Sequence, residues 1–356
     1  MWKAALALFA VALIAGCQKP AEAPSPGASS TSGASGGGEA KTGKLKIAYI
    51  PKNTGNPYFT DVIKGFQDEV KESGDDFVTN APANAQDPQT PIIQEQVQQK
   101  VDVIVVSASS PDALNAALDD AKSKGILVLT VDADLTGNEQ HRDAAVLQAA
   151  PETIGQSQLE LLGKEIGYQG DFAILSATKD APNQNAWIAA MQDALKQPKY
   201  AKMKLVEVAY GDDEPQKSTT EFEALLTKHP GLRGVISPTS VGLAAAARSL
   251  QISGVFPGGP NAKGPGLVLT GLSTPNQMKG FVKAGVVQAF QLWSPHDMGY
   301  AAASLADQVK AGKVKIAEGT KFTAGKLGEL TIGKDNVIFA CPLITFDTSN
   351  IDQYDF

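Results

Sequence analysis

Polar side chains follow the apolar, strand-like runs of this sequence at the points where those runs end. Lys52, Asn53 and Asn56 follow a run at 45–50, and Asp132 follows another at 126–131. These groups suit a polyhydroxylated ligand, because each hydroxyl both donates and accepts hydrogen bonds while an aromatic face covers its C–H groups. With the corresponding positions of the second half and two aromatic residues, the candidate ligand-binding set is Lys52, Asn53, Asn56, Phe59, Asp132, Asn183, Gln184, Asn185, Pro238, Ser240 and Trp293.

Each candidate also has an ordinary structural explanation. Asn and Asp at strand ends commonly form turns or cap helices. Trp293 fits a core position equally well, and Phe59 fits the buried stripe of a helix. Ser110 and Asp112 are best explained as helix caps.

No arrangement of residues predicts catalysis. The three histidines, His141, His229 and His296, are scattered without metal-ligand spacing. The sequence has no Gly-x-Ser-x-Gly elbow and no Rossmann glycine fingerprint. The segment 38–44 matches a phosphate-binding loop only in part, since Leu45 stands where Ser or Thr is required and the segment precedes a strand. We therefore expect no enzyme, no bound metal and no cofactor.

Length and charge narrow the class of protein further. A chain of 356 residues suits two domains better than one. Its hydrophobic content of 43% and charged content of 19% are typical of a globular protein. The formal net charge of −7 argues against nucleic acid as a partner, because nucleic-acid binding needs a basic face.

Strand-like and helix-like segments alternate from residue 45 onward. The run at 101–108 is apolar throughout, as in a parallel strand buried on both faces, and 57–73 carries a helical stripe that ends at Gly74. The same alternation restarts at a helix over 152–166. Repeated βα units predict right-handed crossovers and an α/β fold of two Rossmann-like lobes, with a cleft between them where a small ligand binds.

The N-terminal segment predicts export and a lipid anchor. Residues 1–17 read as a signal peptide whose apolar run is too short to span a bilayer comfortably. The segment Leu13–Cys17 is similar to a bacterial lipobox, which implies cleavage before Cys17 and its lipidation. Residues 18–43 are mostly Ala, Gly, Ser, Pro and Thr, which predicts a disordered tether. Cys341 then has no partner for a disulfide and is expected to be a small buried hydrophobe.

From Lys44 to Phe356 the chain resembles the type I periplasmic sugar-binding proteins, the receptor components of ABC importers. The branch it resembles contains rhamnose-binding proteins and autoinducer-2 receptors. The resemblance rests on the combination of IPKNTGNPYF, VDVIVVSASSPDAL, GDFAILSAT, NQNAW, AYGDD, SPTSVGLAAAA, TGLSTPNQM and SNIDQYDF.

The resemblance implies two lobes that are joined by a three-segment hinge and close over the ligand. It places the crossings near Gln148, Leu272 and Val309. The N-terminal lobe is then expected at 44–148 plus 273–308, and the C-terminal lobe at 149–272 plus 309–356. A membrane permease is the expected protein partner, and the binding protein itself is expected to be a monomer.

The resemblance also bears on the ligand. Lys52 and Asp132 match a Lys and an Asp that bind ligand in autoinducer-2 receptors, but those receptors have Asp-Gln where this chain has Asn183 and Gln184, and Ala at Ser240. Several other segments are more similar to the rhamnose type. We therefore expect a rhamnose-like monosaccharide, with autoinducer-2 as the alternative. Two other classes of protein are disfavoured: a transcription regulator, because this sequence has no helix-turn-helix, and a secreted enzyme, because it has no nucleophile–base pair. A receptor that senses its ligand without transport fits equally well.

Overall fold

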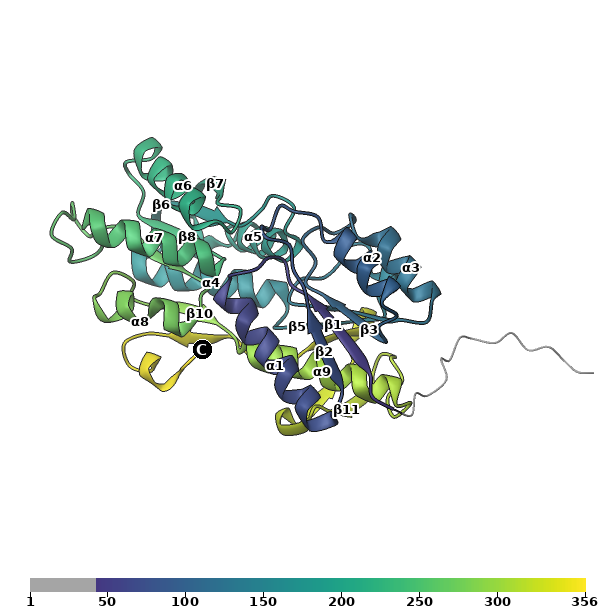
Figure 1. The fold of residues 1–356 in the computed structure, drawn as a ribbon. Coiled ribbons are helices and arrows are strands. Elements are labelled where there is room, and N and C mark those ends of the chain that lie inside the picture. The colour runs from purple at the N-terminus through teal and green to yellow at the C-terminus, as the bar shows by residue number, and fades with distance from the viewer. Residues whose placement is uncertain (1–42) are drawn as a thin grey trace, which may run out of the picture. The chain divides into compact units, whose positions relative to one another are not determined.

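The computed structural model describes residues 43–356 of the chain (Figure 1). The expected signal peptide, the lipidation site Cys17 and the expected tether up to residue 42 lie outside the described residues. Within the described part, no helix is long and apolar enough to cross a bilayer.

Two parallel sheets form the core of the described chain, as the alternating pattern predicts. The first sheet has the order β13-β5-β4-β3-β1-β2 and the second β7-β6-β8-β9, with every neighbouring pair parallel. The strands of the first are β1 (Lys46–Ile50), β2 (Asp76–Thr79), β3 (Val103–Val106), β4 (Leu127–Val131), β5 (Ala144–Leu147) and β13 (Val337–Phe339). Those of the second are β6 (Gln169–Ser176), β7 (Lys202–Tyr210), β8 (Gly234–Ser237) and β9 (Val268–Gly271). Strands β3, β4, β8 and β9 are buried along their whole length, which explains their uninterrupted apolar runs.

Nine α-helices, four short strands and five short 3-10 helices complete the described elements. The helices are α1 (Pro57–Ser73), α2 (Thr90–Gln98), α3 (Asn115–Ser123), α4 (Pro151–Ile166), α5 (Pro182–Ala194), α6 (Pro215–Lys228), α7 (Ser240–Ser253), α8 (Pro275–Lys283) and α9 (Pro295–Lys310). The antiparallel pairs are β10 (Phe290–Leu292) with β14 (Ile344–Phe346), and β11 (Lys321–Thr323) with β12 (Glu329–Thr331). Helix α3 begins at Asn115, later than the expected cap, because the Ser110 hydroxyl bonds to Asp112 and Ala113 in a preceding bend.

The chain passes between the two sheets at three neighbouring segments. The first follows β5 at Gln148, near an expected crossing; the others lie at 293–294 and 340–343 rather than near Leu272 and Val309. Cys341 contacts both other segments: its N–H donates to Gln148 O at 3.1 Å, and its thiol to Ser294 O at 3.4 Å. As expected, Cys341 is buried, and burial raises the pKa of its thiol. Among the described residues it is a free cysteine.

Strand pairing therefore corrects two parts of the expected division into lobes. Val337–Phe339, expected in the C-terminal lobe, pairs with β5 of the first sheet. The segment from α8 to β10, expected in the N-terminal lobe, instead packs with α7, β9 and β14. Helix α9 does lie with the first sheet, beside α1 (Figure 1). Strands of three residues carry too little pattern to reveal their sheet, which explains both errors.

Helices α1 and α9 approach closely because each has a glycine where they cross. A Cβ added at Gly65 would lie 1.9 Å from His296 O, and one at Gly299 would lie 2.1 Å from Val62 O. Asn56 caps the start of helix α1, with its Oδ1 accepting the Tyr58 N–H, so this packing also fixes the loop at the end of β1.

Gly65→Ala should lower the free energy of unfolding by about 1–3 kcal/mol, because the new methyl group meets a backbone carbonyl that cannot move aside. Gly280→Ala is the matched control: it lies at an exposed position of helix α8, with nothing within 4 Å of the added Cβ. That variant should gain up to about 1 kcal/mol from helix propensity. Urea unfolding of both variants measures the difference, and equal effects would contradict the close approach.

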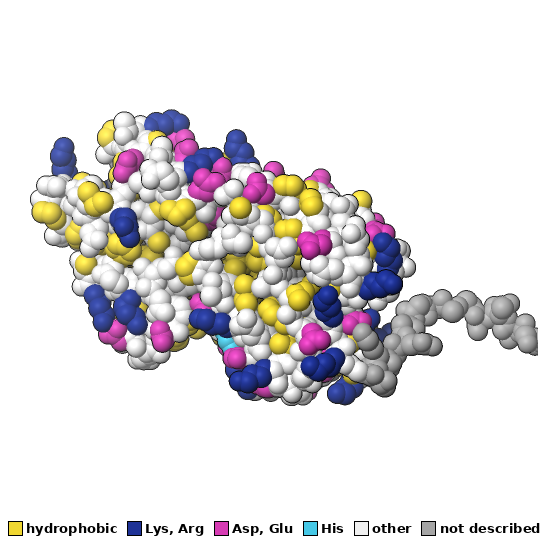
Figure 2. All heavy atoms as spheres, in the orientation of Figure 1, with side chains coloured by type: hydrophobic (Ala, Val, Ile, Leu, Met, Phe, Trp, Pro, Cys, Tyr) yellow, Lys and Arg dark blue, Asp and Glu magenta, His cyan; other side chains and the backbone are white. Residues whose placement is uncertain are grey.

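Charged side chains do not segregate on the visible surface. On the face in Figure 2, acidic and basic side chains are interspersed, with no continuous basic patch.

Candidate functional site

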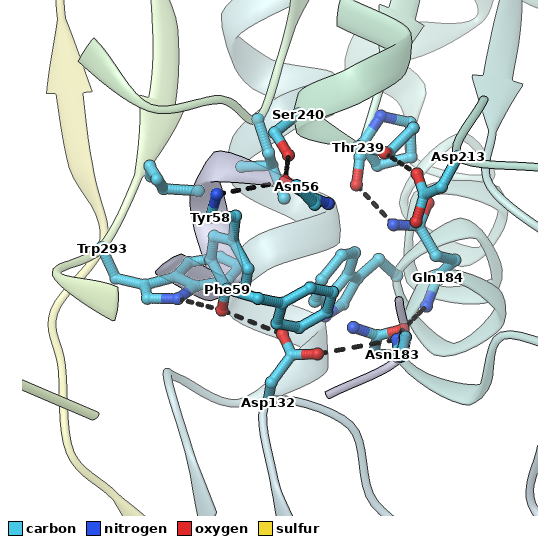
Figure 3. Close-up of a pocket in the computed structure, with 15 residues that line it drawn as sticks. Asn56, Tyr58, Phe59, Asp132, Asn183, Gln184, Asp213, Thr239, Ser240 and Trp293 are labelled. Atoms are coloured by element: carbon cyan, nitrogen blue, oxygen red, sulfur yellow. Dashed lines mark hydrogen bonds and ion pairs between the residues drawn. The ribbon is translucent and has the colours of Figure 1, made fainter. Parts of the chain in front are cut away.

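A cavity lies where the carboxyl ends of strands from both sheets come together (Figure 3). The space between its atoms is about 380 Å³ when the part open to solvent is included. Its lining residues are Lys52, Asn56, Tyr58, Phe59, Asp132, Asn183, Gln184, Trp187, Asp213, Pro238, Thr239, Ser240, Leu272, Leu292 and Trp293. Strand ends are where an open parallel sheet builds ligand sites, so the fold accounts for the position.

All but two of the candidate residues from the sequence line this cavity. The exceptions are Asn53 and Asn185. Asn53 lines a neighbouring groove with Asn84 and Glu214, and its Oδ1 is buried without a hydrogen-bond partner among the described residues. Asn185 is exposed, and its amide nitrogen donates to Lys179 O at 2.8 Å. Asn185 therefore stabilises the turn before α5 rather than facing the cavity.

Asp132 occupies a left-handed backbone position directly after β4, with φ of 68°. Its carboxylate accepts a 2.9 Å hydrogen bond from the Tyr58 hydroxyl, which in turn accepts one of 2.9 Å from Trp293 Nε1. Burial raises the pKa of Asp132, while Lys52 and the Tyr58 hydrogen bond act against that rise. The carboxylate is thus held by fixed donors and still lines the cavity.

Lys52 contacts residues that follow strands of both sheets. Its Nζ donates to Asn183 Oδ1 at 3.0 Å and lies 3.6 Å from Asp132 Oδ2. A second direct bond across the cavity joins the Ser240 hydroxyl to Asn56 Oδ1 at 3.2 Å. These two bonds directly join the two sides of the cavity.

Asn183 and Gln184 make different contributions. Asn183 Oδ1 accepts from Lys52 and from the Gln184 N–H, which leaves its amide nitrogen facing the cavity. Gln184 uses both ends of its amide internally: its nitrogen donates to Pro238 O at 2.6 Å, and its oxygen accepts from the Ser176 hydroxyl. Gln184 therefore positions the loop at Pro238.

Aromatic and aliphatic side chains form the apolar wall. Trp187 and Trp293 make an edge contact with ring centroids 5.8 Å apart, and Trp293 makes another with Tyr58. Leu272 and Leu292 lie beside them. Such a wall covers C–H and methyl groups while the polar residues bind hydroxyls.

Six lining residues are absent from the candidate set: Tyr58, Trp187, Asp213, Thr239, Leu272 and Leu292. Signals exist for four of them. Trp187 lies about one helical turn after Asn183, and Tyr58 precedes Phe59. Asp213 and Thr239 follow the ends of β7 and β8. Nothing in the sequence distinguishes Leu272 and Leu292 from other buried leucines.

Within residues 43–356, no group of three or more His, Cys, Asp or Glu side chains could hold a metal ion.

Comparisons with known proteins agree with this geometry. Residues 47–313 match the family described as "Periplasmic binding protein domain". The chain is similar to a sugar ABC transporter structure from Actinomyces odontolyticus, with 38% identity, a TM-score of 0.69, and coverage of 88% of this chain and 98% of that one. It is also similar to an ABC transporter solute-binding protein from Clostridium phytofermentas with bound L-rhamnose: 32% identity, a TM-score of 0.82, and coverage of 88% and 99%.

A curated relative is more distant. The Bacillus subtilis ribose import binding protein is 21% identical over 72% of this chain and 79% of its own length. These relatives are transport and binding proteins rather than enzymes, which agrees with the prediction of no catalytic function.

Proposed function

Because the chain belongs to the periplasmic binding protein family, as a sugar-binding component of an ABC transporter, we propose that it captures a rhamnose-like monosaccharide in the cavity lined by Asp132. The carrying observation is that this cavity is lined by residues following strands of both sheets, with Lys52–Asn183 and Asn56–Ser240 bonds across it. A ligand held there contacts both sides only when they are closed, so it favours the closed state.

The choice of a deoxyhexose rests on the balance of polar and apolar lining. Asp132, Asn183 and Ser240 offer groups for hydroxyls, while Trp293, Leu272 and Leu292 offer an apolar surface for a methyl group. The L-rhamnose-bound relative supports the same choice. Autoinducer-2 is the alternative, favoured by the presence of both Lys52 and Asp132 in one cavity.

We further propose that the protein works outside the cytoplasm, tethered through Cys17, and delivers its ligand to a membrane permease as a monomer. The motivation is the lipobox-like end of the N-terminal segment followed by a tether rich in small residues. Mass spectrometry of the membrane-extracted protein tests this, since a Cys17→Ala variant should lose the acyl mass and leave the membrane fraction.

Calorimetric titration of residues 44–356 with L-rhamnose and with autoinducer-2 tests the ligand. Both tryptophans of the described chain, Trp187 and Trp293, line the cavity, so ligand should also change the intrinsic fluorescence. Rhamnose binding alone would support the deoxyhexose. Autoinducer-2 binding alone would favour the alternative, and no binding by any neutral monosaccharide or by autoinducer-2 would contradict the proposal.

Sugar affinity should fall as the pH is lowered. Burial raises the pKa of both Asp132 and Asp213 in the ligand-free cavity. Ligand hydroxyls that donate to a carboxylate favour its ionised form, so binding lowers these pKa values and releases protons. Affinity should therefore be constant above the raised pKa values and weaken below them. Titrations from pH 7.5 downward in two buffers of different ionisation enthalpy measure this, and an unchanged affinity without proton release would contradict it.

A further inference from the structure

Asp213 belongs to a tight turn that follows β7. Asp212 and Asp213 both have left-handed backbones, with φ of 54° and 55°. The N–H groups of Gly211 and Asp212 donate to Ser176 O and Ala177 O, which ties the turn to the end of β6. Left-handed positions disfavour most side chains but tolerate Asp and Asn.

The two aspartates of this turn point in different directions. The Asp212 carboxylate forms an ion pair with Lys217 of α6. The Asp213 carboxylate lines the cavity, where one of its oxygens accepts a hydrogen bond from the Thr239 hydroxyl. No hydrogen-bond partner is found for its second oxygen among the described residues 43–356. Figure 3 shows Asp213 beside Thr239 and Gln184, well separated from Asp132.

The charges around the cavity are unbalanced. Its lining contains one cation, Lys52, and two carboxylates, Asp132 and Asp213. Lys52 lies 3.6 Å from Asp132 Oδ2 and donates to Asn183, whereas no ion pair joins it to Asp213 in the described chain. An anionic ligand would add a further negative charge beside two carboxylates and a single cation, Lys52, of which Lys52 and Asp132 are buried.

We infer that Asp213 is a specificity-determining residue of the cavity: its second carboxylate oxygen accepts a sugar hydroxyl on the side away from Asp132, so that the site selects neutral polyhydroxylated ligands and rejects anionic sugars. This inference rests on the proposed function. Asp132 and Asp213 follow strands of different sheets, so a ligand that reaches both also bridges the two sides.

The test compares the wild type with Asp213→Asn and Asp212→Asn. Both substitutions keep the side-chain shape and a residue that tolerates the left-handed backbone, so Asp212→Asn is a matched control in the same turn. The probes are L-rhamnose, D-ribose and D-fucose as neutral sugars, and D-galacturonate, which carries a carboxylate at C6 where D-fucose has a methyl group. Each protein is titrated calorimetrically after its thermal unfolding has been checked.

We expect Asp213→Asn to lower the affinity for whichever neutral sugar the wild type binds by tenfold or more. The preference for that neutral sugar over galacturonate should shrink by a similar factor. Asp212→Asn should stay within twofold of the wild type. If Asp213→Asn does not fold, Thr239→Val, which removes the hydroxyl that holds Asp213, should still weaken neutral sugars and shift the same preference.

Four outcomes would overturn the inference. If Asp213→Asn binds neutral sugars within threefold of the wild type, the inference is overturned while the proposed function stands. The same holds if Asp212→Asn loses as much affinity as Asp213→Asn. If the wild type binds galacturonate as tightly as a neutral sugar, the site does not select its ligand by charge. A wild type that binds none of the neutral sugars would overturn the proposed function together with this inference.

Discussion

Asp132→Ala should weaken sugar binding by about 2–3 kcal/mol, the range for hydrogen bonds to a charged group. Asp132 is 4% exposed, and its carboxylate is fixed by the Tyr58 hydroxyl and lies close to Lys52. Removing it deletes an acceptor for ligand hydroxyls and leaves Lys52 without its nearby carboxylate. The dissociation constant should rise roughly 30- to 150-fold, which calorimetric titration measures directly.

Asp132→Asn separates the effect of losing the charge from the effect of straining the backbone. Ala at φ of 68° is strained in its own right, whereas Asn tolerates the left-handed conformation. Asn should therefore keep the stability of the wild type and still lose most of the affinity. Affinity within threefold of the wild type in both variants would remove Asp132 from the ligand contacts.

Most of this site could be predicted because the polar residues follow strands whose carboxyl ends share an edge. Lys52 and Asn56 lie in the loop after β1, Asp132 directly follows β4, and parallel register brings these strand ends together. Local sequence thus carries enough information to place them. Asn53, in the loop after β1, and Asn185, in the first turn of α5, follow the same logic but do not line the cavity. The direction of each side chain depends on the local backbone path, which the pattern does not reveal.

The hinge and the apolar wall depend on contacts that are distant in sequence. Cys341 meets Gln148 and Ser294 only after β13 has paired with β5, and a three-residue strand has no periodicity by which to assign its sheet. Leu272 reaches the cavity wall beside an isolated bridge to Gln291, again a non-local pairing. Asp213 is an intermediate case, because the strand end is visible in the sequence but the left-handed turn that directs its carboxylate is not.

Trp293→Ala should lower the free energy of unfolding by about 3–5 kcal/mol, as for other large aromatic truncations in cores. Trp293 is 1% exposed, contacts Tyr58 and Trp187 through ring edges, and immediately precedes Ser294 at a crossing between the sheets. The truncation opens a void at the hinge and removes the indole donor that orients the Tyr58 hydroxyl toward Asp132. Urea unfolding measures the stability loss, and titration of the folded fraction should show weaker sugar binding.

Trp293→Phe divides this effect into packing and hydrogen bonding. Phe retains most of the apolar contact but leaves the Tyr58 hydroxyl without its donor, so the loss from that hydrogen bond should be about 1 kcal/mol. A smaller stability loss in Trp293→Phe than in Trp293→Ala would mean that Trp293 stabilises the hinge by packing. Reduced sugar affinity in both variants would mean that it also orients the Asp132 carboxylate through the Tyr58 hydroxyl. A stability change below about 1 kcal/mol in the Ala variant would contradict the buried position, because truncating a fully packed indole costs several times that amount.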